Sequence, residues 1–276
     1  MTPTTNTQVR LKSRPDGIPQ PEHFEVVAAP IPPLRDGQFL VRNDFLSVEP
    51  AMRGWVSAVA NYSTPVGIGE VMRSFAAGEV IASRHPQFAE GDRLMGMFGW
   101  QAFCVAEPSA VTRKVTEADL PLSLSLGILG LNGITAYFGL LDVGRPRPGD
   151  TVVVSTAAGA VGSAVGQIAK IADCRAVGIT GGAASLSSWD PWPQGPRIER
   201  HLLVKRAQMS GLLIFDYQPR YEEAVTRLAD WVRQGKLRYL EEIQDGIEAC
   251  PGAIARLYRG ENLGKSLIRL RHGESR

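Results

Sequence analysis

Small residues in the segment 151–170 are of the kind that lets a protein hold a pyrophosphate by its backbone alone. A β-branched run ends at Ser155, and Ala157, Gly159 and Gly162 then form an A-x-G-x-x-G pattern ahead of an amphipathic helical stretch. Because these positions carry little or no side chain, backbone N–H groups and a helix N-terminus can approach a phosphate closely. The pattern predicts a dinucleotide-binding turn, and a nicotinamide cofactor is the first inference.

The elements around this turn favour the cofactor over a purely structural use of the glycines. Small residues also permit close packing of a helix on a strand without any ligand. Here a Pro-Gly-Asp turn at 148–150 leads into a strand at 151–155, a helix is expected at 161–172, and 174–180 is expected as a second, buried strand. Together they predict a βαβ unit with the turn at the end of its first strand.

The composition is that of a globular protein whose partners are small molecules. The 276 residues are 44% hydrophobic and 21% charged, and the chain is long enough for two domains. The formal net charge of +2 is too small for a nucleic-acid surface. The start of the chain lacks the pattern of a secretory signal, and no long apolar run suggests a membrane span. We therefore expect a cytoplasmic protein that contacts neither nucleic acid nor membrane.

The cysteines and histidines do not indicate a metal site. Cys104, Cys174 and Cys250 are widely separated, form no C-x-x-C motif and have no histidine nearby. A catalytic zinc needs cysteine and histidine ligands that converge on one point. We expect three buried free thiols and no metal.

The chain divides into three regions. Residues 1–125 contain short β-type runs between Pro and Gly turns and predict a compact, mostly β domain. Residues 126–235 contain the nucleotide-binding unit and end in an amphipathic helix at 221–234. Residues 236–276 are expected to return to the first domain through a strand, a helix and a last strand at 266–270.

Five further motifs follow one another along the chain in a fixed order. They are SVEPAMRG at 47–54, GEVMR at 69–73, GDRLMG at 91–96, TAYFGLL at 135–141 and GENLGK at 260–265. Together with the glycine turn they resemble the zinc-independent medium-chain dehydrogenases/reductases. Within these, the chain is similar to the leukotriene 12-hydroxydehydrogenase, prostaglandin reductase and alkenal double-bond (curcumin-type) reductase family, over nearly its whole length.

The resemblance implies an α/β fold in which a GroES-like, mostly β domain accompanies a Rossmann-type parallel-sheet domain. It also implies NADPH-dependent reduction of the carbon–carbon double bond of α,β-unsaturated ketones and aldehydes, without a metal, in a homodimer. The substrate would be a small apolar conjugated carbonyl compound. The protein must then hold the nicotinamide C4 near the β-carbon and stabilise the enolate that forms on the carbonyl oxygen.

The resemblance further implies which residues form the site. The cofactor-binding residues are Asn132, Thr135, Ala158, Gly159, Ala160, Val161, Gly162 and Asn262. The residues that border the substrate are Met52, Tyr62, Met72 and Trp189, and Tyr62 is the catalytic candidate. Plainer alternatives remain open, since asparagines also cap helices and turns and buried methionines also fill cores.

The chain departs from the family in its pocket tyrosines. Ala51 and the Ser-Ser-Trp-Asp element at 187–190 stand where the family has a tyrosine. Each change removes a phenolic hydrogen-bond donor, so Tyr62 and Tyr137 remain as candidates for the proton donor.

A larger departure is a gap after the second strand of the βαβ unit. The sequence passes at once from Gly182 to residues that follow a later strand in the family, so several central βα units, roughly sixty residues, are missing from the Rossmann domain. Three explanations of the gap stay open: the sequence omits residues that the protein has, the protein carries an internal deletion, or the fold is rebuilt around fewer strands. We favour a family member that lacks its central Rossmann segment.

Two other functions stay open beside enone reduction. The same cleft could serve a quinone reductase, or the chain could be a non-catalytic, internally deleted remnant that binds no cofactor. The apolar stretch 204–217 is expected as a strand or helix edge suited to two-fold pairing.

Overall fold

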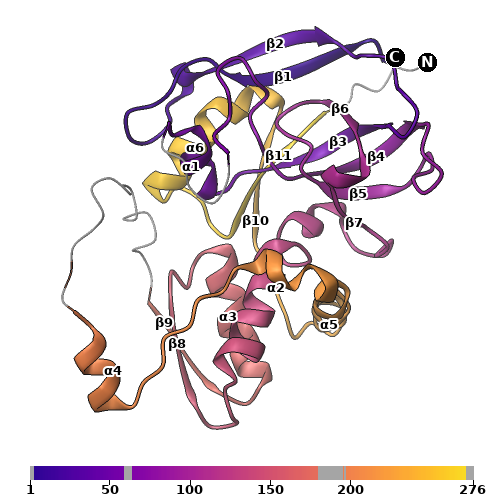
Figure 1. The fold of residues 1–276 in the computed structure, drawn as a ribbon. Helices are drawn as coiled ribbons and strands as arrows, with labels where there is room; N and C mark the ends of the chain where they lie inside the picture. Colours follow the sequence, from indigo (N-terminus) through magenta and orange to yellow (C-terminus); the bar gives the residue numbers. More distant parts are fainter. Residues whose placement is uncertain (1–2, 59–63, 180–194, 196, 272–276) are drawn as a thin grey trace. The chain divides into compact units, whose positions relative to one another are not determined.

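The structure is a computed structural model that describes residues 3–58, 64–179, 195 and 197–271 and divides into two compact units (Figure 1). The first unit comprises residues 1–130 and 239–276, and the second comprises residues 131–238. Each unit has its own sheet: the first has an antiparallel-rich β structure and the second a short parallel pair. The expected α/β fold with a mostly β domain and a shortened Rossmann-like region is confirmed.

The first unit is built on a sheet to which both ends of the chain contribute. Within the described residues its strand order is β10-β11-β3-β4-β5-β7, and β6 also pairs with β3. Strands β10 and β11 are parallel, and the other pairs are antiparallel. The strands are β3 (Phe39–Ser47), β4 (Ala76–Ser83), β5 (Arg93–Gly96), β6 (Phe103–Ala106), β7 (Val111–Lys114), β10 (Glu241–Asp245) and β11 (Lys265–Arg269).

An antiparallel ribbon and short helices complete this unit. Strands β1 (Thr5–Leu11) and β2 (Phe24–Pro30) pair along their whole length (Figure 1). The α-helices are α1 (Ala51–Val56) and α6 (Cys250–Arg259), and the short 3-10 helices are Pro21–His23, Pro108–Ala110, Leu122–Leu126 and Ile247–Ala249.

The core of the first unit contains aromatic side chains and hydrogen-bonded polar groups. Trp100 is fully buried, its ring lies 5.7 Å from that of Phe24, and its Nε1 donates a 3.0 Å hydrogen bond to the Ser47 carbonyl. Arg113 is also buried: its Nη1 pairs with Glu117 at 3.0 Å, while its Nε has no hydrogen-bond partner among the described residues. Large buried aromatics with partnered polar atoms are typical of a fully formed core.

The second unit contains one βαβ element and further helices. Strands β8 (Thr151–Ser155) and β9 (Arg175–Ile179) are parallel, and α3 (Ala160–Ile171) connects them and contacts both. Helix α3 also contacts α2, which contacts α5. The other elements are α2 (Leu131–Phe138), a π-helical turn at Gly139–Gly144, α4 (Glu199–Lys205), a 3-10 helix at Ile214–Arg220 and α5 (Tyr221–Arg233).

One face of the β8–β9 pair is apolar and exposed. Val153 is 60% exposed, its cross-strand partner Val177 37%, and Ile179 54%. The prediction of a buried strand at 174–180 is therefore wrong for β9. Within the described residues β8 and β9 pair only with each other, so the further strands and helices that cover such a strand in a full Rossmann sheet are absent here.

The segment 204–217 differs from its prediction as well. Helix α4 ends at Lys205, and a 3-10 helix begins at Ile214, with no strand in the described residues between them. Val204, Leu213 and Phe215 are 61%, 49% and 48% exposed.

None of the described helices combines the length and the apolar character that crossing a lipid bilayer requires.

Candidate functional site

The predicted dinucleotide turn lies between β8 and α3. Strand β8 ends at Ser155, and Thr156 then takes a left-handed conformation with φ of 55°. The Ala157 N–H donates to the Ile179 carbonyl at 3.0 Å, and the Gly159 N–H donates to the Thr156 carbonyl at 2.9 Å. These two bonds fix the path of the backbone into α3.

Gly162 is required by the packing of this turn. A Cβ atom at Gly162 would lie 2.3 Å from the carbonyl oxygen of Thr156, a distance that no real side chain tolerates. A Cβ at Gly159 would lie 3.3 Å from the same oxygen. The glycines therefore have a structural purpose in the turn, as the plainer interpretation proposed.

The N-terminus of α3 fits an anionic group. Gly159 is the N-cap and no side chain caps the helix. The N–H groups of the first helical turn have no intrahelical acceptor, so those of Ala160, Val161 and Gly162 remain to be satisfied. Together with the positive end of the helix dipole they suit a phosphate. The Gly159 N–H, which was expected to join them, is instead used within the turn.

Asn132 and Thr135 lie one turn apart on α2, so their side chains share one face of that helix. The Oδ1 atom of Asn132 is buried and has no hydrogen-bond partner among the described residues. Asn132 is inside the helix, which begins at Leu131, and so is not its N-cap. A buried acceptor without a donor is costly, and a carboxamide donor such as that of nicotinamide fits it.

Asn262 belongs to the first unit, unlike the other cofactor candidates. It follows Gly260, which ends α6 with a φ of 70°. The Asn262 Nδ2 donates to the Gly264 carbonyl at 3.1 Å, so the side chain stabilises its own turn. Asn262 therefore stabilises a turn, as the plainer alternative for this residue proposed. Its Oδ1 atom takes no part in that hydrogen bond.

The two methionines expected at the substrate are fully buried. Met52 lies in the first turn of α1 and Met72 follows the bridge between Arg10 and Val71. The Met72 backbone is bonded on both sides, to the Val9 carbonyl at 2.8 Å and from the Trp100 N–H at 2.9 Å. Both side chains therefore fill the core of the first unit in this structure.

Tyr62, Trp189 and the Ser-Ser-Trp-Asp element at 187–190 lie outside the described residues. Arg14 holds the backbone on both sides of the Tyr62 segment, because its guanidinium donates at 2.9 Å to the carbonyls of Val56 and Val66. The other tyrosine candidate, Tyr137, donates to Glu223 Oε1 at 3.3 Å. Burial, and then the Glu223 carboxylate, raise the pKa of Tyr137.

The described part of the chain offers no metal centre. It contains no group of three or more His, Cys, Asp or Glu side chains placed to share an ion. The three cysteines are free and buried, as expected. Burial raises the pKa of Cys104 to about 12, which keeps this thiol protonated and unreactive.

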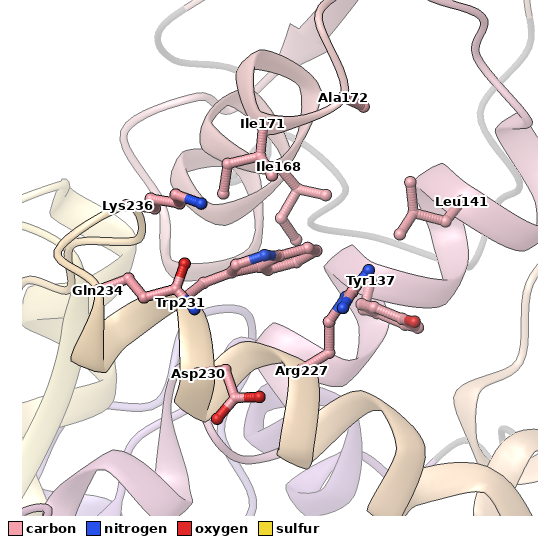
Figure 2. Close-up of a pocket in the computed structure, with 10 residues that line it drawn as sticks. All are labelled: Tyr137, Leu141, Ile168, Ile171, Ala172, Arg227, Asp230, Trp231, Gln234 and Lys236. Atoms are coloured by element: carbon pink, nitrogen blue, oxygen red, sulfur yellow. The ribbon is translucent and has the colours of Figure 1, made fainter.

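A pocket of about 530 Å³ lies among α2, α3 and α5 (Figure 2). Trp231 and Ile168 form its apolar wall, and Arg227 lies over the Trp231 ring at 5.6 Å. Of the candidate residues, Tyr137 lines this pocket, and none of the predicted cofactor-binding or substrate-bordering residues does. Its lining residues are Tyr137, Leu141, Ile168, Ile171, Ala172, Arg227, Asp230, Trp231, Gln234 and Lys236.

Sequence reasoning missed a buried charge cluster in the first unit. Lys265 donates to Ser47 Oγ at 2.6 Å and to Glu49 Oε1 at 3.1 Å. Both partners belong to the motif at 47–54, and Lys265 ends the motif at 260–265. A lysine at the start of an apolar strand, Lys265-Ser-Leu-Ile, was the signal that could have revealed it, because a buried lysine needs an acidic partner.

Known proteins match this chain in sequence and in fold. A family described as the N-terminal domain of oxidoreductase matches residues 7–114. The NADPH-dependent curcumin reductase of Escherichia coli is 32% identical over 94% of this chain and 95% of its own length. Prostaglandin reductase 1 of Mus musculus is 30% identical over 94% of this chain and 97% of its own length.

The structure of CurA from Vibrio vulnificus superposes with a TM-score of 0.85 at 32% identity, covering 98% of this chain and all of that chain. CurA has also been solved in complex with NADPH, with the same TM-score.

The alignments also bear on the gap in the Rossmann region. The alignment with the Escherichia coli enzyme runs over 330 positions, whereas this chain has 276 residues. It must therefore contain positions at which the relative has a residue and this chain has none. With the ordered motifs and the turn at α3, the identities show that the chain belongs to the medium-chain dehydrogenase/reductase family of NADP-dependent oxidoreductases, in the group of the prostaglandin, curcumin and alkenal reductases.

Proposed function

We propose that this protein binds NADPH and reduces the carbon–carbon double bond of small apolar α,β-unsaturated ketones and aldehydes by hydride transfer to the β-carbon. The observation that carries the proposal is the uncapped N-terminus of α3 behind the A-x-G-x-x-G turn. The names of the relatives support it, since they include a curcumin reductase and a 2-alkenal reductase that use NADPH or NADP.

The residues present would hold the cofactor at two points. The N–H groups of Ala160, Val161 and Gly162 would bind the pyrophosphate, and Asn132, with Thr135 beside it, would accept from the carboxamide. When bound, NADPH supplies the hydride. Asn262 would add a contact from the first unit.

The chain's remaining task is to bind the substrate and to stabilise negative charge on its carbonyl oxygen. Met52 and Met72, which are buried in the core of the first unit, would back the apolar side of the pocket, and Trp189 would border the same pocket. A hydrogen-bond donor at the carbonyl oxygen lowers the barrier, and Tyr62 is our candidate for that donor and for the proton that reaches the α-carbon.

We also propose that the protein is a homodimer. The exposed apolar side chains of the segment 204–217, among them Val204 and Phe215, support a self-complementary contact. Light scattering coupled to size-exclusion chromatography tests this, and a monomer at micromolar concentration would contradict it.

A cofactor-free remnant is the second candidate, and the bare face of β8–β9 favours it. Val153 and Ile179 are exposed where a complete Rossmann domain buries its strands. In this alternative the first unit stays folded and the α3 turn binds nothing.

A fluorescence titration with NADPH, and separately with NADH, separates the two candidates. The variant Ala160→Asp places a carboxylate in the first turn of α3, where it favours the helix dipole but repels a phosphate. We expect it to weaken NADPH binding by at least about tenfold without lowering the melting temperature. Ala160→Gln, which adds bulk without charge, is the matched control and should bind NADPH better than the Asp variant.

Turnover is then measured with 2-alkenals and NADPH deuterated at C4. Deuterium at the β-carbon of the product would support the proposed reaction, and oxidation of NADPH by quinones alone would favour a quinone reductase. A folded protein that binds neither NADPH nor NADH would establish the remnant instead.

A further inference from the structure

Lys265 is a buried lysine whose three hydrogen bonds all go to one turn. Its side chain is only 5% exposed. Its ammonium donates to Ser47 Oγ at 2.6 Å, Glu49 Oε1 at 3.1 Å and the Val48 carbonyl at 3.3 Å. Three donors thus meet three acceptors, and all three belong to the turn that joins β3 to α1.

The partners of Lys265 are themselves held in place. Ser47 Oγ lies 2.8 Å from Glu49 Oε1, which closes a ring of three polar groups. The Ser47 carbonyl accepts from Ser74 Oγ at 2.8 Å and from Trp100 Nε1 at 3.0 Å. Ser47, Ser74 and Trp100 are fully buried, so the turn has one well-defined position.

Stability alone does not explain a lysine at this position. Taking an ammonium and a carboxylate out of water costs free energy, and apolar residues of similar volume often stabilise a fold as well or better. A buried ion pair with complete hydrogen bonding instead selects one arrangement of the segments that it joins. The question is therefore which segments Lys265 joins.

On one side the cluster fixes the start of α1. The Met52 N–H donates to the Glu49 carbonyl at 3.1 Å, so the position of Glu49 sets the first turn of the helix. A second link reaches the same turn from α6, because the Tyr258 hydroxyl donates to the Pro50 carbonyl at 2.9 Å.

On the other side the cluster fixes the Asn262 turn. The Lys265 N–H donates to the Leu240 carbonyl at 2.9 Å. Gly264 has a φ of 71°, and a Cβ there would lie 2.1 Å from that carbonyl oxygen. Asn262 Nδ2 in turn donates to the Gly264 carbonyl at 3.1 Å. The backbone from Asn262 to Lys265 therefore has little freedom.

We propose that Lys265 is a positioning residue: its ammonium joins the Asn262 turn to the start of α1, and so sets the spacing between a cofactor contact and the helix whose Met52 backs the substrate pocket. This proposal rests on the proposed function, in which Asn262 meets the cofactor and Met52 backs the substrate pocket. Hydride transfer is sensitive to small displacements, because a shift of about 1 Å can reduce the rate about a hundredfold.

The test compares the full-length chain with Lys265→Met, Glu49→Gln and the double variant. Each single change leaves one buried charge unpaired and should lower the melting temperature, whereas the double variant removes both charges and should recover most of it. We expect kcat for a 2-alkenal to fall on the order of 10- to 100-fold in Lys265→Met and to stay low in the double variant. The Kd for NADPH should change far less.

Lys114→Met is the matched control. It breaks the 2.6 Å ion pair with Asp92, which is partly exposed in the same unit, and should change neither kcat nor Kd. A double variant with wild-type kcat would overturn the proposal, because the pair would then be structural only.

Hydrogen exchange gives a readout that does not depend on turnover. In the double variant, exchange should accelerate in the peptides 47–56 and 260–265 and stay unchanged in β4 and β5. Unchanged exchange in both peptides would overturn the proposal. Absence of NADPH binding and turnover in the wild-type chain would instead contradict the proposed function, and the exchange data would still decide whether Lys265 joins the two segments.

Discussion

The sheet of the first unit and the strand pair of the second differ in how completely the chain covers them. In the first, β3 has partners on both sides, and Val41 in its centre is fully buried. In the second, β8 and β9 pair only with each other in the described residues, and Val153 is 60% exposed. The same residue type thus contributes very different amounts of buried area. The comparison teaches that the β propensity of a segment is enough to predict a strand, whereas the stability of that strand depends on the strands and helices that pack against it.

The largest expected effect is in the core of the first unit. Trp100→Ala removes a fully buried ring and the hydrogen bond to the Ser47 carbonyl, and should lower the free energy of unfolding by about 3–5 kcal/mol. Urea denaturation followed by circular dichroism measures this. Phe215→Ala in the second unit, at a ring that is 48% exposed, is the control and should have a much smaller effect. Equal losses would contradict the contrast between the units.

Hydrogen exchange should separate the two sheets directly. A two-stranded sheet with one bare face is marginal, so the amides of β8 and β9 should open at a free energy about 2–3 kcal/mol below those of β3 and β4. Peptides that cover 151–155 and 39–47 report the two values by mass spectrometry. Equal protection would mean that something covers β8–β9 in solution.

A matched pair of valine substitutions sharpens the comparison. Val41→Ala should lower the free energy of unfolding by about 2 kcal/mol, because Val41 is fully buried. Val153→Ala should change it by less than about 0.5 kcal/mol, because little buried area is lost. Denaturation of both variants under the same conditions gives the two numbers. A large loss at Val153 would show that this face is covered.

The smallest expected effect is the stability that the Asp92–Lys114 ion pair loses in acid. The Lys114 ammonium lowers the pKa of Asp92 below its usual value, more than burial raises it. The pKa of Asp92 is lower in the folded state than in the unfolded state. The Asp92–Lys114 pair therefore contributes its full stabilisation above the unfolded-state pKa of about 4, and this stabilisation is lost as the pH falls through the folded-state pKa. We expect about 0.5 kcal/mol or less, seen as a difference between wild type and Lys114→Met at pH 6 that vanishes below about pH 3. A difference that persists in acid would refute the assignment.

Local patterns were sufficient to predict the βαβ element. The strand at 151–155 matches β8, and the helix predicted at 161–172 is α3, Ala160–Ile171. Both depend on short-range signals, a β-branched run and an amphipathic period, that one segment carries alone. The prediction of a buried β9 failed because burial depends on strands that must come from elsewhere in the chain.

In the candidate site, too, features set by local sequence were predictable, and features set by distant contacts were not. The turn at Gly159 and Gly162 was predictable, since its geometry is local. Two other features could not be predicted, because they depend on three-dimensional surroundings: Asn132 Oδ1 has no partner in the described part of the chain, and the Gly159 N–H is used within the turn. The Lys265–Glu49 pair joins residues 216 positions apart, and no local pattern reveals such a distant contact.

The pairing of β3 with β11 determines when the first unit can be completed during synthesis. Leu267 pairs with Ser47, so the sheet closes only after Leu267 has left the ribosome. The second unit is contiguous in sequence and can form earlier. Until Leu267 has emerged, the nascent first unit presents an open strand edge at residues 45–47 of β3, and a chaperone bound there would prevent this edge from pairing with other chains.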